Sequence, residues 1–373
     1  MKKHLSTIII SVFILVICFI SAKQFLAQRI PEYIARGPGV TEIKMLSDWF
    51  PRLKGCRGDT EVYILRGTEP GGSVLIMGGS HPNEPAGYIS AILLIENVQV
   101  SAGTLYIIPR LNNSAFSNTE PQHAHPRTFS IEKPDGSNRT FRFGSRLTNP
   151  LDQWPDLEVY IHAASGQTLS GNEVRNMNRA FPGRADGNFT ERVAYGITEL
   201  VKQENISMTI DLHEAAPEYP VVNAIVAHQR AMTIASYAII FGLEALDITI
   251  GLEPSPPNLR GLSHRELGQY TNTLAILLET TNPAQGRLRG RTDETLVLTG
   301  RDKYYVRAHA LGRLFVPYDD TGHSLDNRVA RHMAAVQELI YALSDAYPEL
   351  EVVVDGIPSY FELNEFGIGA FLK

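Results

Sequence analysis

The sequence has 373 residues and a formal net charge of −6, from 34 basic and 40 acidic side chains. This near balance argues against a nucleic-acid-binding protein, because such a surface needs a concentration of basic residues. A chain of this length can bury a large core, so we expect one large α/β domain, alone or with a small appendage.

The N-terminal segment is the one part with an unusual composition. Lysines and a histidine precede Thr7 to Ala22, a run without a charged side chain. A helix over this run would measure about 24 Å, short of the roughly 30 Å hydrocarbon core, which suits a signal-peptide core or a short anchor. A cleavage site before residue 23 or 28 would need small residues at positions where the sequence has large ones. We therefore expect residues 1–27 to form an uncleaved or slowly cleaved signal anchor. A cleaved signal peptide and a buried N-terminal helix are the alternatives.

The charges around this segment predict its orientation. Because the basic residues precede the apolar run, the positive-inside rule places the rest of the chain outside the cytoplasm, in the periplasm or the extracellular space. If the signal is cleaved, the protein would be secreted. Of the two cysteines, Cys18 lies inside the run and Cys56 is alone in the remaining chain. A metal site in the domain must therefore use His, Asp and Glu.

The following residues predict an α/β domain over 58–346, joined to the segment by a linker over 28–57 and followed by a tail over 347–373. Apolar runs bounded by turn residues predict strands, and helical periodicity predicts helices. The expected strands are 61–66, 74–77, 104–109, 208–212, 221–227 and 272–278. The expected helices are 41–50, 85–97, 189–205, 230–243 and 325–346. Residues 110–179 have no long periodic segment, which is typical of a functional or disordered loop.

Three expected strands lead into residues that can bind a metal or transfer a proton. Strand 74–77 precedes His81 and Glu84, strand 208–212 precedes His213, and strand 272–278 precedes Glu279. Histidine and glutamate are costly to bury unless they are paired or bind a metal, so this coincidence indicates a functional site. In open α/β sheets, such strand ends lie at the crevice where ligands bind.

The residue types at these ends suit a catalytic zinc ion. Imidazole nitrogens of His81 and His213 and a carboxylate oxygen of Glu84 are zinc ligands, and three protein ligands leave one coordination position open for water. Such a water loses a proton near neutral pH and becomes a nucleophile. Glu279 could act as general base towards the water and then as acid towards the leaving amine.

Asn178 and Arg179 precede the expected helix 189–205. An arginine can bind a substrate carboxylate through two parallel hydrogen bonds, and an adjacent asparagine can add a neutral one. Without the metal motif, an exposed turn would be the favoured interpretation. Three residues before Glu279 could also line the site, although ordinary core or surface positions are the favoured interpretation: His264, Arg265 and Tyr270. His123 and His125 could bind a metal together, but we expect them to be a solvated pair in a loop.

Four motifs, in this order, resemble the zinc carboxypeptidase superfamily. They are Gly79-Ser-His81-Pro-Asn-Glu84, Asn178-Arg179-Ala-Phe-Pro, Asp211-Leu-His213-Glu and Leu-Leu-Glu279-Thr. The asparagine before Glu84, where peptidases usually carry arginine, is closer to the succinylglutamate desuccinylase/aspartoacylase branch. The resemblance covers roughly residues 72–283. It implies a single domain with a mixed, mostly parallel central sheet flanked by helices.

The resemblance also implies roles for these residues. His81, Glu84 and His213 would bind one zinc ion per chain, Glu279 would be the catalytic carboxylate, and Asn178 with Arg179 would hold the substrate carboxylate. A further arginine is expected to stabilise the oxyanion, and five candidates remain open: Arg110, Arg127, Arg139, Arg142 and Arg175. Two positions depart from the family pattern: Pro82 replaces the usual glycine, and Asn176-Met replaces the usual Asp-Leu. These departures affect the expected identity of the substrate more than the expected binding of a metal.

These observations predict a zinc-dependent hydrolase that cleaves an amide bond next to a carboxylate. The family branch favours a small N-acyl amino acid as substrate, whereas a location outside the cytoplasm favours peptides such as those of a cell wall. The alternative from another class is a non-catalytic binding protein that retains the fold. All three expected zinc ligands and the expected catalytic carboxylate are intact, which argues against that alternative.

Overall fold

The computed structural model describes residues 2–120 and 123–373. One compact unit ends at Tyr33, and a second covers Ile34–Lys373. The first unit holds helix α1 (Lys2–Ala27), in which the 24 residues His4–Ala27 are apolar enough to cross a membrane. This apolar stretch is longer than the uncharged run, so it spans about 36 Å and exceeds the thickness of the hydrocarbon core. A signal sequence near the N-terminus also meets these criteria of length and composition.

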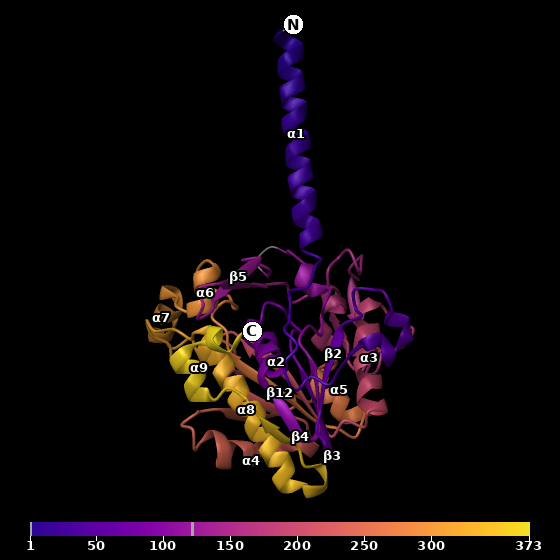
Figure 1. Ribbon diagram of the computed structural model, residues 1–373, viewed down its shortest axis with the longest axis vertical. Coiled ribbons are helices and arrows are strands. Elements are labelled where there is room, and N and C mark those ends of the chain that lie inside the picture. The colour runs from indigo at the N-terminus through magenta and orange to yellow at the C-terminus, as the bar shows by residue number, and fades with distance from the viewer. Residues whose placement is uncertain (1, 121–122) are drawn as a thin grey trace. The chain divides into compact units, whose positions relative to one another are not determined.

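Figure 1 shows the helices and strands of the second unit. Among the described residues, the main sheet of this unit has nine strands. Their order is β1-β2-β4-β3-β9-β12-β10-β11, with β13 beside β4. The strands are β1 (Glu42–Met45), β2 (Glu61–Arg66), β3 (Glu69–Met77), β4 (Gln99–Ile108), β9 (Met208–Ala215), β10 (Ala224–Ala227), β11 (Gly251–Pro254), β12 (Leu274–Thr281) and β13 (Val353–Asp355). The central strands β4, β3, β9 and β12 are parallel to their neighbours in this run. The predicted mixed, mostly parallel sheet is therefore confirmed.

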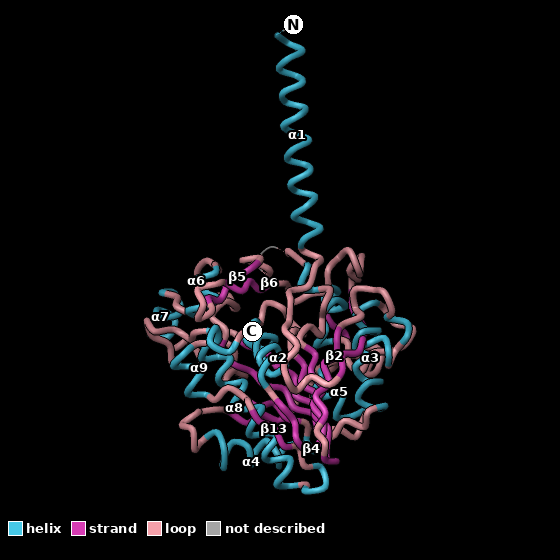
Figure 2. The backbone as a smooth tube through the Cα atoms, viewed as in Figure 1, coloured by secondary structure: helices cyan, strands magenta, loops and turns pink. Residues whose placement is uncertain are grey.

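Helices cover both faces of this sheet (Figure 2). Side chains alternate between the faces of a strand, so Val74 and Ile76 of β3 enter one core while Leu75 and Met77 enter the other. The first core also contains residues of α2, α4 and α8, and the second contains residues of α3 and α5. The helices are α2 (Pro85–Asn97), α3 (Phe189–Gln203), α4 (Met232–Tyr237), α5 (Ser263–Tyr270), α6 (Glu294–Thr299), α7 (Lys303–Ala310), α8 (Leu325–Ala346) and α9 (Tyr360–Phe366).

Most predicted elements are present, with differences at their ends. Helices α2 and α8 have the predicted bounds. Strands β9 and β12 continue past their predicted ends and include His213 and Glu279, because the two strands pair with each other as far as Ala215 and Thr281. The predicted helix over 41–50 is wrong. Its first half is β1, which pairs with β2, and this tertiary pairing outweighs the local helical pattern.

Short elements were not predicted. The segment 110–179 contains two hairpins, formed by β5 (Thr128–Glu132) with β6 (Asn138–Arg142) and by β7 (Val159–Ile161) with β8 (Thr168–Ser170). Helices α5, α6, α7 and α9 span eight residues or fewer, too short for a clear periodic signal. Strand β1 lies in the expected linker and β13 in the expected tail, so both segments contribute to the sheet.

Candidate metal centre and active site

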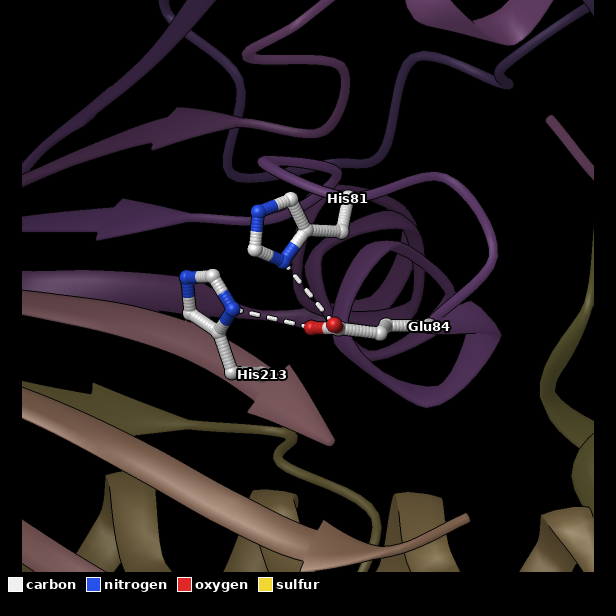
Figure 3. A group of neighbouring side chains, drawn as sticks. All are labelled: His81, Glu84 and His213. Atoms are coloured by element: carbon white, nitrogen blue, oxygen red, sulfur yellow. Dashed lines mark hydrogen bonds and ion pairs between the residues drawn. The ribbon is translucent and has the colours of Figure 1, made fainter. Parts of the chain in front are cut away.

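His81 and Glu84 lie in the connection between β3 and α2. Gly79 has a φ of +71°, a conformation that favours glycine, so the chain turns directly after β3. Gly87, in the first turn of α2, lies against β9, and a Cβ atom there would be 2.3 Å from the carbonyl oxygen of Leu212. This close approach brings Glu84 beside His213 of β9 (Figure 3).

The three side chains form one compact, buried group. His81 Nδ1 is 2.8 Å from Glu84 Oε1, and His213 Nδ1 is 2.8 Å from Glu84 Oε2 (Figure 3). One potential ligand atom from each of the three side chains lies within 4.8 Å of the other two. In the described ranges, this is the one group of three or more His, Cys, Asp or Glu residues that could hold a metal ion.

The outer ring nitrogens of both histidines face oxygen atoms. His81 Nε2 lies 2.8 Å from Asn176 Oδ1, and His213 Nε2 lies 2.9 Å from Asp211 Oδ2. Asn176 Oδ1 accepts a hydrogen bond from His81 Nε2, and the Asp211 carboxylate forms an ion pair with the His213 ring at Nε2, which leaves each Nδ1 facing Glu84 and able to present its lone pair to a metal. Metal-binding histidines are typically oriented in this way, so the residues fit a zinc ion. Asn176, at the position where the resemblance implies an aspartate, also supplies an acceptor.

The electrostatics of the group favour a bound cation. Burial and the positive charge of Arg146 lower the pKa of His81 to about 4. Burial would raise the pKa of Glu84, but the two histidines hold it well below its usual range. Burial would lower the pKa of His213, but the carboxylates of Asp211 and Glu84 raise it well above its usual range. The buried carboxylates of Glu84 and Asp211 therefore stabilise positive charge between the two histidines.

The remaining predicted site residues line the same cavity, which has a volume of about 660 Å³. The structure thus brings together all six residues that the sequence predicted: His81, Glu84, Asn178, Arg179, His213 and Glu279. Leu277, Val226 and Glu253 add a wall from three neighbouring strands, since Val226 pairs with both of the other two residues. The cavity is larger than the metal group needs, so it has room for an organic ligand.

Glu279 enters the cavity from β12. It occupies the position paired with His213 on the neighbouring parallel strand. Its Oε2 atom is buried and has no hydrogen-bond partner, and burial raises the pKa of this carboxyl to about 8. A carboxyl group in this environment is suited to exchanging a proton near neutral pH.

Asn178 and Arg179 end a short 3₁₀ helix (Met177–Arg179) that begins with a capping bond from the Asn178 N–H to Asn176 Oδ1. Asn178 Oδ1 accepts a hydrogen bond from the N–H of Ser263, which leaves the Asn178 Nδ2 donor for a ligand. Arg179 is held by a bond from Nη1 to the Asn178 carbonyl. The pair therefore presents donors in fixed positions.

Arg146 also lines the cavity, and it was not predicted from the sequence. Its Nη1 atom lies 3.4 Å from Glu84 Oε1. None of the five arginines proposed for the oxyanion is among the residues that line the cavity: Arg110, Arg127, Arg139, Arg142 and Arg175. Arg139 pairs with Glu96, and Arg175 pairs with Asp156. The neighbour of Arg146, Leu147, forms a bridge with Asn176, a long-range contact that local sequence patterns do not reveal.

Glu214 connects the metal group to the helical layer. Its N–H donates to Glu84 Oε2 at 3.1 Å, and its carboxylate accepts from the Ala86 N–H at 2.9 Å. Arg328 of α8 lies 2.7 Å from Glu214 Oε1, and neither side chain of this ion pair is exposed. Burial raises the pKa of Glu214 to about 7, against the lowering effect of Arg328. The ion pair with Arg328 thus fixes Glu214, and the bond from the Glu214 N–H fixes the carboxylate of Glu84.

Of the three residues before Glu279 that could have lined the site, one lies at the cavity. His264 is buried and lines the cavity, as the alternative to an ordinary core or surface position expected, and neither of its ring nitrogens has a hydrogen-bond partner. Burial lowers the pKa of His264 to about 3, so the ring is neutral. Arg265 and Tyr270 are not among the lining residues, and Arg265 donates to the carbonyl of Pro256.

The chain also matches a known protein family. The model of the succinylglutamate desuccinylase/aspartoacylase catalytic domain matches residues 70–280, which is more than half of the chain. This range includes all six predicted site residues and Arg146. A search of curated proteins finds no significant match.

Three solved structures are among those to which this chain is similar. A succinylglutamate desuccinylase/aspartoacylase from Rhodobacter sphaeroides is 17% identical with a TM-score of 0.37, over 62% of this chain and 54% of that one. The product-bound ectoine utilization protein EutE (DoeB) from Ruegeria pomeroyi is 20% identical with a TM-score of 0.38, over 59% and 53%. A metallo-carboxypeptidase from Burkholderia cenocepacia is 14% identical with a TM-score of 0.44, over 87% and 68%. The chain thus spans about half the length of the first two structures.

Proposed function

We propose that this chain, which belongs to the succinylglutamate desuccinylase/aspartoacylase family of hydrolases, is a zinc-dependent enzyme that cleaves an amide bond next to a carboxylate. One observation carries the proposal. Three buried ligand atoms lie within 4.8 Å of one another, in the same cavity as the unpaired carboxyl of Glu279 and the donors of Asn178 and Arg179. This is the set of groups that amide hydrolysis needs.

In this proposal His81, Glu84 and His213 hold one zinc ion. Zinc in such a site makes water a nucleophile at neutral pH and polarises a carbonyl group. Glu279 takes a proton from the attacking water and returns it to the nitrogen of the leaving amine. The unpaired Oε2 atom supports this role, because a structural carboxyl at a buried position would have a partner.

Two of the arginines that line the cavity have different roles in this proposal. Arg179 and the Nδ2 donor of Asn178 bind the carboxylate of the substrate, since both are held in place by backbone bonds. Arg146, whose guanidinium lies beside Glu84, stabilises the negative charge that develops on the carbonyl oxygen during attack.

Two substrate classes satisfy this chemistry. Membership of the family favours a small N-acyl amino acid. Helix α1 favours the alternative, an exported carboxypeptidase that acts on peptides, because a basic N-terminus before an apolar helix predicts a catalytic unit outside the cytoplasm. In both cases the residue that carries the anchored carboxylate becomes the leaving amino acid.

The test uses the full-length, zinc-loaded protein in a mild detergent. It is assayed against N-acyl amino acids and against peptides, each prepared with a free and with an amidated C-terminal carboxylate. Hydrolysis of either free-acid series, with loss of turnover on amidation, supports the proposal and identifies the class. A zinc-loaded protein that hydrolyses neither series, or that prefers the amidated forms, would contradict it.

A further inference from the structure

His264 is a buried polar side chain whose ring makes no hydrogen bond among the described residues. It is the second residue of α5, is 3% exposed, and lines the cavity. Neither Nδ1 nor Nε2 has a hydrogen-bond partner among the described residues. Leaving a buried donor and acceptor unpaired costs free energy, so a purely structural position would be better filled by an apolar side chain.

The position of His264 relates it to the proposed carboxylate anchor. The preceding residue, Ser263, donates its N–H to Asn178 Oδ1 at 2.9 Å. Gly261, with a φ of +78°, lies against the backbone of Arg179, where a Cβ atom would be 2.1 Å from the carbonyl oxygen. The start of α5 is therefore fixed directly beside the two residues that present donors to the substrate.

The neighbouring lining is mainly apolar. Leu259 and Leu262 precede His264, and the wall formed by the sheet holds Val226 and Leu277 together with Glu253. In such surroundings a neutral imidazole offers one donor and one acceptor to an uncharged ligand group, and it supplies no positive charge to pair with a second carboxylate.

We propose that His264 is a specificity-determining residue, which binds an uncharged hydrogen-bonding group, such as an amide or hydroxyl, on the side chain of the amino acid whose carboxylate is anchored. The inference deepens the proposed function and rests on the carboxylate anchor formed by Asn178 and Arg179. It holds for N-acyl amino acids and for peptides, because both present an amino acid with a free carboxylate. A site built to hydrogen-bond a ligand group rejects an isosteric ligand that lacks it.

Asparagine and leucine provide a matched pair, because their side chains have the same branched shape. Binding of N-acetyl-L-asparagine, N-acetyl-L-leucine and N-acetyl-L-aspartate is measured by calorimetry on the zinc-loaded, full-length protein. The protein carries Glu279→Gln, so that binding is observed without turnover. We expect the asparagine ligand to bind about tenfold more tightly than the leucine ligand, the effect of one or two hydrogen bonds, and the aspartate ligand to bind more weakly than the asparagine ligand.

The variant His264→Leu should remove this preference and bring the ratio of the two affinities to about one or below. His162→Leu is the matched control, since His162 is also buried but has both ring nitrogens paired, with Ser165 Oγ and the Phe181 carbonyl. We expect this control to lower the melting temperature and keep the ratio. His264→Leu should keep or raise the melting temperature, because it removes two unpaired polar atoms from the interior.

Several results would overturn the inference. They are an unchanged ratio in His264→Leu, a wild-type preference for the leucine or aspartate ligand, no binding of any of the three ligands, and a loss of stability in His264→Leu as large as that in His162→Leu. Failure of the proposed function is a separate result. If the asparagine ligand binds with the expected preference but the enzyme with Glu279 intact hydrolyses no amide, the subsite stands and the hydrolase proposal falls.

Discussion

Glu279 and His213 are paired neighbours on the parallel strands β12 and β9. Side chains at paired positions of a parallel ladder project from the same face, so both reach the cavity. The strand register, and not a flexible loop, therefore sets the separation between the proposed proton-transfer group and a proposed metal ligand. Such placement on rigid elements is what a catalytic group requires.

This relationship leads to a prediction for Glu279→Gln. Glutamine is nearly isosteric but cannot take up a proton, so turnover of the true substrate should fall by about 10²- to 10⁴-fold. Zinc content should stay unchanged, because Glu279 is not one of the three proposed ligands. Steady-state kinetics and metal analysis of the same preparation provide the check. Loss of zinc, or near-normal turnover, would require the roles to be reassigned.

Asn176 should contribute to metal affinity without touching the ion. Its Oδ1 atom accepts from His81 Nε2 at 2.8 Å and so orients the ring. Removing such a partner typically weakens metal binding about 10- to 100-fold. We expect Asn176→Leu to raise the zinc dissociation constant by that factor, as measured with a competing chelator.

Asn176→Asp serves as the control, because it retains an acceptor at the same position and should bind zinc at least as tightly as the wild type. Equal affinity in Asn176→Leu and the wild type would show that the contact does not orient His81.

Much of this site follows from the sequence, because its residues adjoin strong local signals. The apolar run before Gly78 and the proline at the start of α2 place His81 and Glu84 between a strand and a helix. Arg146 and His264 carry no such signal. Arg146 reaches the cavity through the bridge between Leu147 and Asn176, and His264 lies at the start of an eight-residue helix. Both positions depend on tertiary contacts that periodicity does not encode.

Stability should depend on pH through Glu204, which is remote from the cavity. Burial raises its pKa, but bonds donated by Tyr106 Oη and Trp49 Nε1 outweigh this effect and lower the pKa below its usual value. A group with a lowered folded-state pKa stabilises the fold above its unfolded pKa of about 4.3, and the contribution disappears as pH falls through the folded value.

We therefore expect Glu204→Gln to reduce the unfolding free energy by about 1 kcal/mol at pH 7, a value discounted for partial exposure. The difference from the wild type should shrink towards pH 3. Urea unfolding across this pH range, in a mild nonionic detergent, measures it. A difference that grows on acidification would contradict the assigned sign.

The position of the second unit relative to the cytoplasm can be tested directly. Because the basic residues at the start of α1 precede its apolar run, we expect Ile34–Lys373 to be exported and to remain attached to the membrane. In cells with a permeable or absent outer envelope, protease added from outside should digest this unit and spare a cytoplasmic marker. Recovery of the intact chain in the soluble cytoplasmic fraction would contradict the prediction.

The most direct test of the account is the zinc content of the full-length protein after zinc loading and removal of free metal. The wild type should bind one zinc ion per chain, and His213→Ala should bind almost none, because it removes one of three ligands. His228→Ala is the control, since this histidine caps a different segment and is not in the metal group, and it should retain full occupancy. Substoichiometric zinc in the wild type, or full occupancy in His213→Ala, would contradict the central claim.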